Sequence, residues 1–215
     1  MRLTFVLFSG LPGTGKSALA ARLARETHWP LLGIENLAAC LPAAMDRNTH
    51  TFWDQAIAAL LLLIEAQLDL GISVIADSIF MNHDRFHARA IARQTGARFL
   101  PVHTFVSNQV IWEQRVTARF QTSDPADGVA SWEQVMAQLQ GFRPWEQGTA
   151  LFVDALLPLA ENYARVSACV NNPQLEFQPL AEVSFTPGKY HGFGLNRTTA
   201  PSGENEVVPA TGYYD

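Results

Sequence analysis

The segment Gly10-Leu11-Pro12-Gly13-Thr14-Gly15-Lys16-Ser17 decides how this chain of 215 residues folds. Its glycines permit a turn in which successive backbone N–H groups point inward and form a nest for an anion. The apolar run 3–8 before it predicts a strand buried on both sides. The stretch Lys16–Thr27 after it is rich in Ala, Leu and Arg and predicts a helix. A strand, a glycine loop of this spacing and a helix together predict a phosphate-binding loop.

The loop predicts that the chain binds a nucleoside triphosphate, with ATP and Mg²⁺ as the expected pair. The positive end of the helix dipole adds to the inward-pointing amides, and the Lys16 ammonium can reach the β- and γ-phosphates. The Ser17 hydroxyl can ligate Mg²⁺. The residues expected to contact the nucleotide are Gly10, Leu11, Pro12, Gly13, Thr14, Gly15, Lys16, Ser17 and Ala18.

Strand-like and helix-like segments alternate along the chain, which is typical of a parallel sheet covered on both faces. Further strands are expected at residues 31–34, 72–76, Arg98–Phe105 and 150–153. Helices are expected at residues 52–70, 84–95, 109–120, 131–140 and 157–170. The sequence therefore predicts an α/β domain over residues 1–170.

The composition changes at residue 171. Five of the chain's twelve prolines follow it, and helical periodicity disappears. Residues 171–215 are therefore predicted to form an extended, irregular Pro/Gly-rich tail. A homodimer or a protein partner bound through this tail stays open from the sequence.

The whole-chain composition limits the classes of partner. Hydrophobic residues make up 48% and charged residues 16%, as in a compact globule. The net charge of −5 and the presence of only two lysines, Lys16 and Lys189, argue against a nucleic-acid partner. Two cysteines give no disulfide framework, and the apolar run 56–64 is too short to cross a bilayer. We expect a cytoplasmic protein with no membrane partner.

Two carboxylates are candidates for chemistry beside the loop. Asp77 ends a predicted buried strand, where ligands of open α/β sheets gather, and can hold Mg²⁺ or its waters. Glu35 follows the second predicted strand and can orient an acceptor hydroxyl and take its proton. A turn cap at Asp77 and a solvated glutamate at Glu35 are the alternatives, and either carboxylate can serve as the base.

Three arginines are candidates for contacts with phosphate or substrate. Arg115 and Arg119 are four residues apart on one predicted helix face, followed by a polar loop at 121–128. The helix and this loop could form a lid over the nucleotide, on which two guanidinium groups can stabilise charge during phosphoryl transfer. The alternative is that the two arginines lie on a solvated helix face. Arg85 either binds an anionic part of the substrate or holds the loop after Asp77.

Other residues suggest no chemistry of their own. His83 and His87 lie at i and i+4, but no third ligand has a fitting spacing for a metal. Trp112, Trp132 and Trp145 are interpreted as packing residues.

At this point the sequence resembles P-loop kinases of the AAA_33 type, relatives of polynucleotide 5′-hydroxyl kinase, the zeta toxins and chloramphenicol phosphotransferase. The residues that carry the resemblance are Gly10–Ser17, Ile75-Ala76-Asp77-Ser78 with Arg85, Arg115-Val116-Thr117-Ala118-Arg119, and the late Val153-Asp154. The resemblance covers about residues 1–170. It implies a P-loop three-layer αβα sandwich with five parallel strands in the order 2-3-1-4-5. It also implies ATP and Mg²⁺ as co-substrates and transfer of the γ-phosphate to a hydroxyl.

The sequence departs from this family after its second strand. These kinases usually place an aspartate there, followed shortly by a substrate-holding arginine. Here Ile34-Glu35-Asn36-Leu37 stands at that place, and no arginine follows until Arg47. Glu35 would therefore act as the base with one more methylene of reach. The missing arginine weakens the case for an acceptor that is a nucleic-acid end.

The function expected from the sequence is an ATP-dependent kinase for a hydroxyl of a small molecule. Lys16, Glu35, Asp77, Arg115 and Arg119 are the candidate catalytic residues, with Glu35 and Arg85 binding substrate and Ser17 and Asp77 holding Mg²⁺. Alternatives are a polynucleotide 5′-hydroxyl kinase, a toxin-type kinase, and a nucleotide-binding accessory ATPase that acts on a protein partner through the tail.

Overall fold

The computed structural model describes residues 2–41, 49–123, 129–178, 195–199 and 205–209. Its centre is a five-stranded parallel sheet in the order β2-β3-β1-β4-β5. The strands are β1 (Thr4–Ser9), β2 (Leu31–Gly33), β3 (Val74–Asp77), β4 (Arg98–Phe105) and β5 (Leu151–Asp154). The predicted strand order is confirmed.

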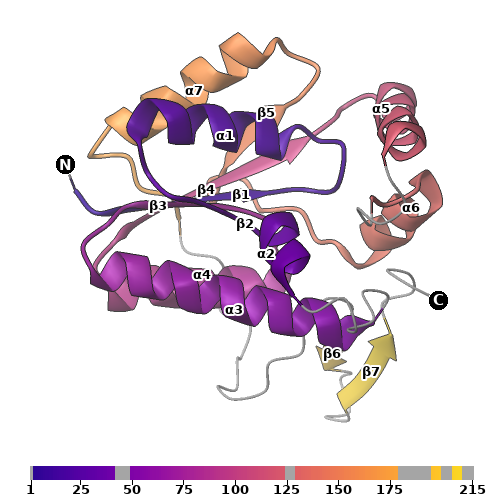
Figure 1. The fold of residues 1–215 in the computed structure, drawn as a ribbon, viewed down its shortest axis with the longest axis horizontal. Coiled ribbons are helices and arrows are strands. Elements are labelled where there is room, and N and C mark those ends of the chain that lie inside the picture. The colour runs from indigo at the N-terminus through magenta and orange to yellow at the C-terminus, as the bar shows by residue number, and fades with distance from the viewer. Residues whose placement is uncertain (1, 42–48, 124–128, 179–194, 200–204, 210–215) are drawn as a thin grey trace.

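Helices cover both faces of the sheet (Figure 1). On one face lie α1 (Lys16–Thr27) and α7 (Leu159–Asn171), and on the other lie α3 (His50–Asp69) and α4 (Asn82–Gln94). The short helix α2 (Ile34–Cys40) follows β2, while α5 (Gln109–Thr122) and α6 (Trp132–Gly141) lie beyond the ends of the strands. The result is the expected three-layer sandwich.

Alternate residues of β1 divide the core into two halves because successive side chains of a strand face opposite sides. Phe5 and Leu7 pack in the half that α3, α4 and α6 cover, whereas Val6 and Phe8 pack in the half beneath α1 and α7. All six residues of β1 are buried, as expected of a central strand of a parallel sheet.

Helix α3 is the most apolar helix of the described residues. By length and composition alone, its segment Thr51–Asp69, with a mean hydropathy of 1.2, meets the minimum for a membrane span. Its residues Ile57, Leu60 and Ile64 are buried in the core. A core helix of a soluble protein passes the same test, so the finding is weak evidence for a membrane.

Two elements differ from the sequence-based expectations. Helix α2 was not expected, and Glu35 lies in its first turn, not in a loop. Ile34 and Ala38 are buried one turn apart and anchor this helix to the core. In the tail, expected to be irregular, β6 (Leu195–Thr199) pairs antiparallel with β7 (Asn205–Pro209). Both strands contain adjacent β-branched residues, which favour paired strands.

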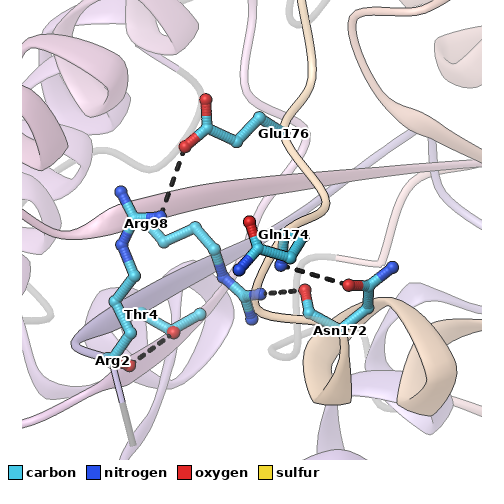
Figure 2. A network of polar contacts seen from close by, with 6 residues as sticks. All are labelled: Arg2, Thr4, Arg98, Asn172, Gln174 and Glu176. Carbon is cyan, nitrogen blue, oxygen red and sulfur yellow. Dashed lines mark hydrogen bonds and ion pairs between the residues drawn. The ribbon is translucent and has the colours of Figure 1, made fainter.

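The first residues of the tail are attached to the edge of the sheet where β1 and β4 begin (Figure 2). Arg98 is buried and donates hydrogen bonds to the carbonyl oxygens of Val170 and Asn172, at the end of α7. Arg2 forms an ion pair with Glu176 at 3.2 Å. These contacts fix residues 170–176 at the edge opposite the phosphate loop. Most of the remaining tail lies outside the described residues, so a homodimer or a protein partner bound through the tail stays open.

Candidate functional site

The phosphate loop contains two positions where a side chain has no room. Gly10 has φ +147°, and a Cβ atom there would lie 2.3 Å from the Thr104 carbonyl oxygen. Gly13 has φ +78°, and its Cβ would lie 2.7 Å from Cγ2 of Val116. These values explain why the loop needs glycine at both positions: one lies against β4 and the other against α5.

Side-chain hydrogen bonds hold the loop in shape. The indole Nε1 of Trp112 donates to the Pro12 carbonyl oxygen at 2.7 Å. The Thr14 hydroxyl donates to the Leu11 carbonyl oxygen at 2.7 Å, and Lys16 Nζ donates to the same oxygen at 3.1 Å. Trp112 is buried, as its interpretation as a packing residue implies, but its contact with the loop was not predicted.

Lys16, Ser17 and Ala18 form the first turn of α1, directly after the loop. Burial lowers the pKa of Lys16, whereas the carboxylates of Asp77 and Glu35 raise it and Arg119 lowers it. The four charged groups therefore lie close enough to influence one another, although they come from α1, β3, α2 and α5.

Asp77 ends β3, where it is in register with Phe8 of β1 and Gly33 of β2. Burial raises the pKa of its carboxyl group, while the Lys16 ammonium and a hydrogen bond with the Ser17 hydroxyl lower it. Its Oδ1 is buried and has no hydrogen-bond partner among the described residues. An unpartnered carboxylate oxygen next to a hydroxyl is a suitable site for Mg²⁺, which binds oxygen ligands. Mg²⁺ keeps several of its coordination positions for phosphate and water.

Glu35 and Arg119 form an ion pair at the rim of the site. Arg119 Nη2 lies 3.1 Å from Glu35 Oε2, and the side chains are 44% and 68% exposed, respectively. The neighbouring Arg115 donates to the Ala155 carbonyl oxygen at 3.1 Å. A Cβ atom at Gly15 would lie 3.6 Å from the Cβ of the same Ala155, so Arg115 lies beside the phosphate loop. Arg119 is close enough to Lys16 to lower the pKa of its ammonium group. The polar loop expected after α5 lies mainly outside the described residues.

Arg85, the remaining candidate, lies on α4 and is 2% exposed. Its Nε donates to the Phe80 carbonyl oxygen at 2.7 Å, and its Nη1 donates to the Arg143 carbonyl oxygen at 2.7 Å. Arg85 therefore holds the loop that follows Asp77, which is one of the two predicted roles. Binding of an anion by Arg85 stays a prediction.

The histidine pair shows no metal-binding arrangement. His83 lies 3.1 Å from the Asp84 carboxylate, and in the part of the chain that the structure describes no three His, Cys, Asp or Glu side chains form a metal cluster.

The geometry can be compared with known proteins. The sequence profile of AAA_33, an AAA domain, matches residues 5–145. The chain belongs to the AAA_33 family. The match includes the phosphate loop, Asp77 and both arginines of α5, so the resemblance stated from the sequence is confirmed. No curated protein matches the chain significantly.

Several solved structures share the fold of this AAA_33 protein. A protein from Chloroflexus aurantiacus, provisionally assigned as a kinase, is 21% identical with a TM-score of 0.61, over 79% of this chain and 97% of the other. A sugar kinase from a Janibacter species is 16% identical with a TM-score of 0.59, over 79% and 95%. APS kinase from Mycobacterium tuberculosis, in complex with AMPPNP and APS, is 19% identical with a TM-score of 0.57, over 80% and 99%. At these identities the likeness establishes the P-loop kinase fold.

Proposed function

We propose that this AAA_33 protein is an ATP-dependent phosphotransferase that moves the γ-phosphate of ATP to a hydroxyl of a small molecule. The observation that carries the proposal is the convergence of Lys16, Asp77, Glu35 and Arg119 beside the phosphate loop. The set contains two cations for the phosphates, one carboxylate for the metal and one for the acceptor. The fold shared with a sugar kinase and with an APS kinase that binds AMPPNP supports the same reading.

The phosphate loop binds the nucleotide in this proposal. Its backbone amides and the Lys16 ammonium surround the β- and γ-phosphates. Ser17 and Asp77 hold Mg²⁺, which neutralises phosphate charge when it is bound. Burial already lowers the pKa of Lys16, so its ammonium gains a strong interaction when the phosphates arrive.

Glu35 is the proposed base because the Asp77 carboxylate already interacts with residues that follow the phosphate loop. The Ser17 hydroxyl forms a hydrogen bond with Asp77, whereas Glu35 forms an ion pair with the partly exposed Arg119 side chain at the rim. In the transfer, the acceptor oxygen bonds to the γ-phosphorus and its proton passes to Glu35. The bond from the γ-phosphorus to the bridging oxygen breaks, and ADP leaves. Arg115 and Arg119 stabilise the charge of the transferred group.

A small molecule is preferred as the acceptor because a nucleic acid would require a basic channel. The net charge is −5, and the chain has two lysines. Arg85 is the proposed substrate-binding arginine, and a cytoplasmic location accompanies the proposal.

The test is ADP release from ATP and Mg²⁺ by the purified full-length chain, measured with and without a broad panel of hydroxyl compounds. A 5′-hydroxyl oligonucleotide is included in the panel. The proposal expects at least one small compound to accelerate ADP release and to acquire the phosphate. It is contradicted if ATP is consumed no faster with any compound than without, or if the oligonucleotide is the preferred acceptor.

A further inference from the structure

A group of buried polar side chains lies on the sheet face that α4 and α6 cover. Its members are 2–5% exposed, and each has a polar atom without a hydrogen-bond partner among the described residues. They are Ser78, Arg85, His103, Gln138 and Trp145. Ring contacts connect three of them. His103 stacks on the Phe142 ring at 5.7 Å, and the Arg85 guanidinium lies 4.8 Å from the Phe142 ring and 4.8 Å from the Trp145 ring.

Arg85 brings a buried positive charge to this group. It donates to the carbonyl oxygens of Phe80 and Arg143 and weakly to Asn82 Oδ1, all of them uncharged acceptors. Its Nη2 has no partner, and Arg85 forms no ion pair within the described residues. The adjacent Asp84 accepts a hydrogen bond from the Met81 amide, and only its field acts on Arg85. A buried guanidinium with a free nitrogen and no ion-paired carboxylate can therefore bind a further anionic group.

His103 connects this group to the phosphate loop. It lies in β4 opposite Ser9 of β1, immediately before the loop begins. Burial, the Arg85 charge and, more weakly, the Lys16 charge lower the pKa of His103 to about 4, against a hydrogen bond with the Ser9 backbone that raises it. His103 therefore lies within electrostatic reach of both the buried arginine and the loop lysine. It is neutral near pH 7, and its Nδ1 remains without a partner.

Gln138 supplies a neutral donor and a neutral acceptor. It lies on α6 one turn before Phe142, whose amide donates to the Gln138 carbonyl oxygen at 3.0 Å. Neither atom of its side-chain amide has a partner among the described residues. A buried polar group without a hydrogen-bond partner destabilises the fold, because folding removes it from water without compensation. On this face of the sheet, such groups offer a ligand hydrogen-bond donors and acceptors that the described residues leave unused.

We propose that Arg85, His103 and Gln138 form the subsite for an anionic group of the acceptor. The substrate is then a small hydroxyl compound that also carries a carboxylate or a phosphate. This inference rests on the proposed phosphotransferase function, because the acceptor must reach the γ-phosphate from this subsite. Arg85 binds the anion, and the neutral groups of His103 and Gln138 bind its oxygens or neighbouring hydroxyls.

The first test compares acceptors matched in carbon skeleton. One set is glycerol, glycerate and glycerol 3-phosphate, and the other is glucose, gluconate and glucose 6-phosphate. ADP release gives kcat/KM for each compound. The inference expects an anionic member of at least one set to exceed its neutral member by tenfold or more, and the carboxylate and phosphate arms identify which anion is used. Equal or higher kcat/KM for the neutral members overturns it.

The second test uses Gln138→Leu, because Arg85 also supports the loop after Asp77 and its replacement can disturb folding. Leucine removes both unpartnered amide atoms, so the fold should be retained. The variant should lower kcat/KM for the preferred anionic acceptor at least tenfold and leave the KM for ATP unchanged. Gln140→Leu, an exposed substitution on the same helix, is the matched control. A change below twofold in Gln138→Leu overturns the inference.

Binding separates failure of this inference from failure of the proposed function. If no compound accelerates ADP release, the same compounds are titrated into the protein with AMPPNP and Mg²⁺ by calorimetry. Binding of anionic compounds that Gln138→Leu weakens supports the subsite and contradicts the phosphotransferase. If anionic compounds do not bind, the subsite is overturned. If neutral compounds alone are phosphorylated, the phosphotransferase function is supported and the anionic subsite is overturned.

Discussion

Replacing Lys16 by methionine should separate nucleotide affinity from protein stability. A hydrogen bond to a charged group contributes about 1.5–3 kcal/mol, so loss of the ammonium should weaken ATP binding about 10- to 150-fold. Stability should change little. Burial of Lys16 lowers its pKa and is unfavourable for its charge, while methionine has a similar length and no charge. The lost attraction to Asp77 opposes this gain, and protonation of Asp77, whose pKa burial already raises, limits that loss.

The assay is calorimetric titration of AMPPNP with Mg²⁺, together with thermal unfolding of the same preparations. Saturating nucleotide at about 100 times Kd should stabilise the native protein by about 2.7 kcal/mol, and the variant should lose most of this at equal concentration. Arg25→Met, exposed near the end of the same helix, is the control and should bind normally. A Kd within threefold of the native value, in a variant with a native unfolding temperature, refutes the role of Lys16.

Three further outcomes are expected. Gly10→Ala should abolish detectable nucleotide binding while circular dichroism stays native-like, because its Cβ would lie 2.3 Å from the Thr104 carbonyl oxygen; binding within tenfold of native contradicts this. Glu35→Gln should lower kcat about 100-fold or more with ATP affinity unchanged, and a kcat above a tenth of native removes Glu35 as the base. The pKa of His103 is about 4 in the native protein and about 6.5 in the unfolded chain, so the unfolded chain takes up the proton first as pH falls. Protonation of His103 should therefore lower the free energy of unfolding by up to about 3 kcal/mol between pH 6.5 and pH 4. Denaturant titrations at pH 7 and pH 4.5 should show a smaller loss in His103→Phe than in the native protein, and equal losses contradict the pKa.

The body of the fold could be predicted because its signals are local. The limits of α1 and of β4 agree with the prediction to the residue, since a glycine loop, an apolar run and a helix former each act over a few positions. Helix α2 was missed because seven residues give barely two turns of periodicity. The signal available in the sequence was the pair of apolar residues Ile34 and Ala38 at i and i+4. It predicts a helix only when the sheet provides a surface against which the two side chains pack.

The candidate site divides in the same way. The phosphate loop could be predicted from the sequence because its functional groups lie within eight consecutive residues. Trp112 and Thr104 support it from 100 and 90 residues away, and no sequence spacing predicts which indole or hydroxyl a β-strand order brings there. The sequence placed Arg85 at the start of a helix, yet its enclosure by Phe142 and Trp145 depends on where α6 returns to the sheet.

The interactions of the polar groups on the nucleotide side of the site bear on the order in which nucleotide and acceptor act. On the nucleotide side, Lys16 donates to Leu11, and Arg119 pairs with Glu35. An exposed ion pair such as that of Arg119 and Glu35 contributes at most about 1 kcal/mol, so a triphosphate can take over the arginine at little cost. If Arg119 stabilises the transferred phosphoryl group as proposed, its interaction with the phosphates replaces the ion pair with Glu35 and releases this carboxylate for the acceptor hydroxyl. Binding of the nucleotide therefore prepares the base for the acceptor.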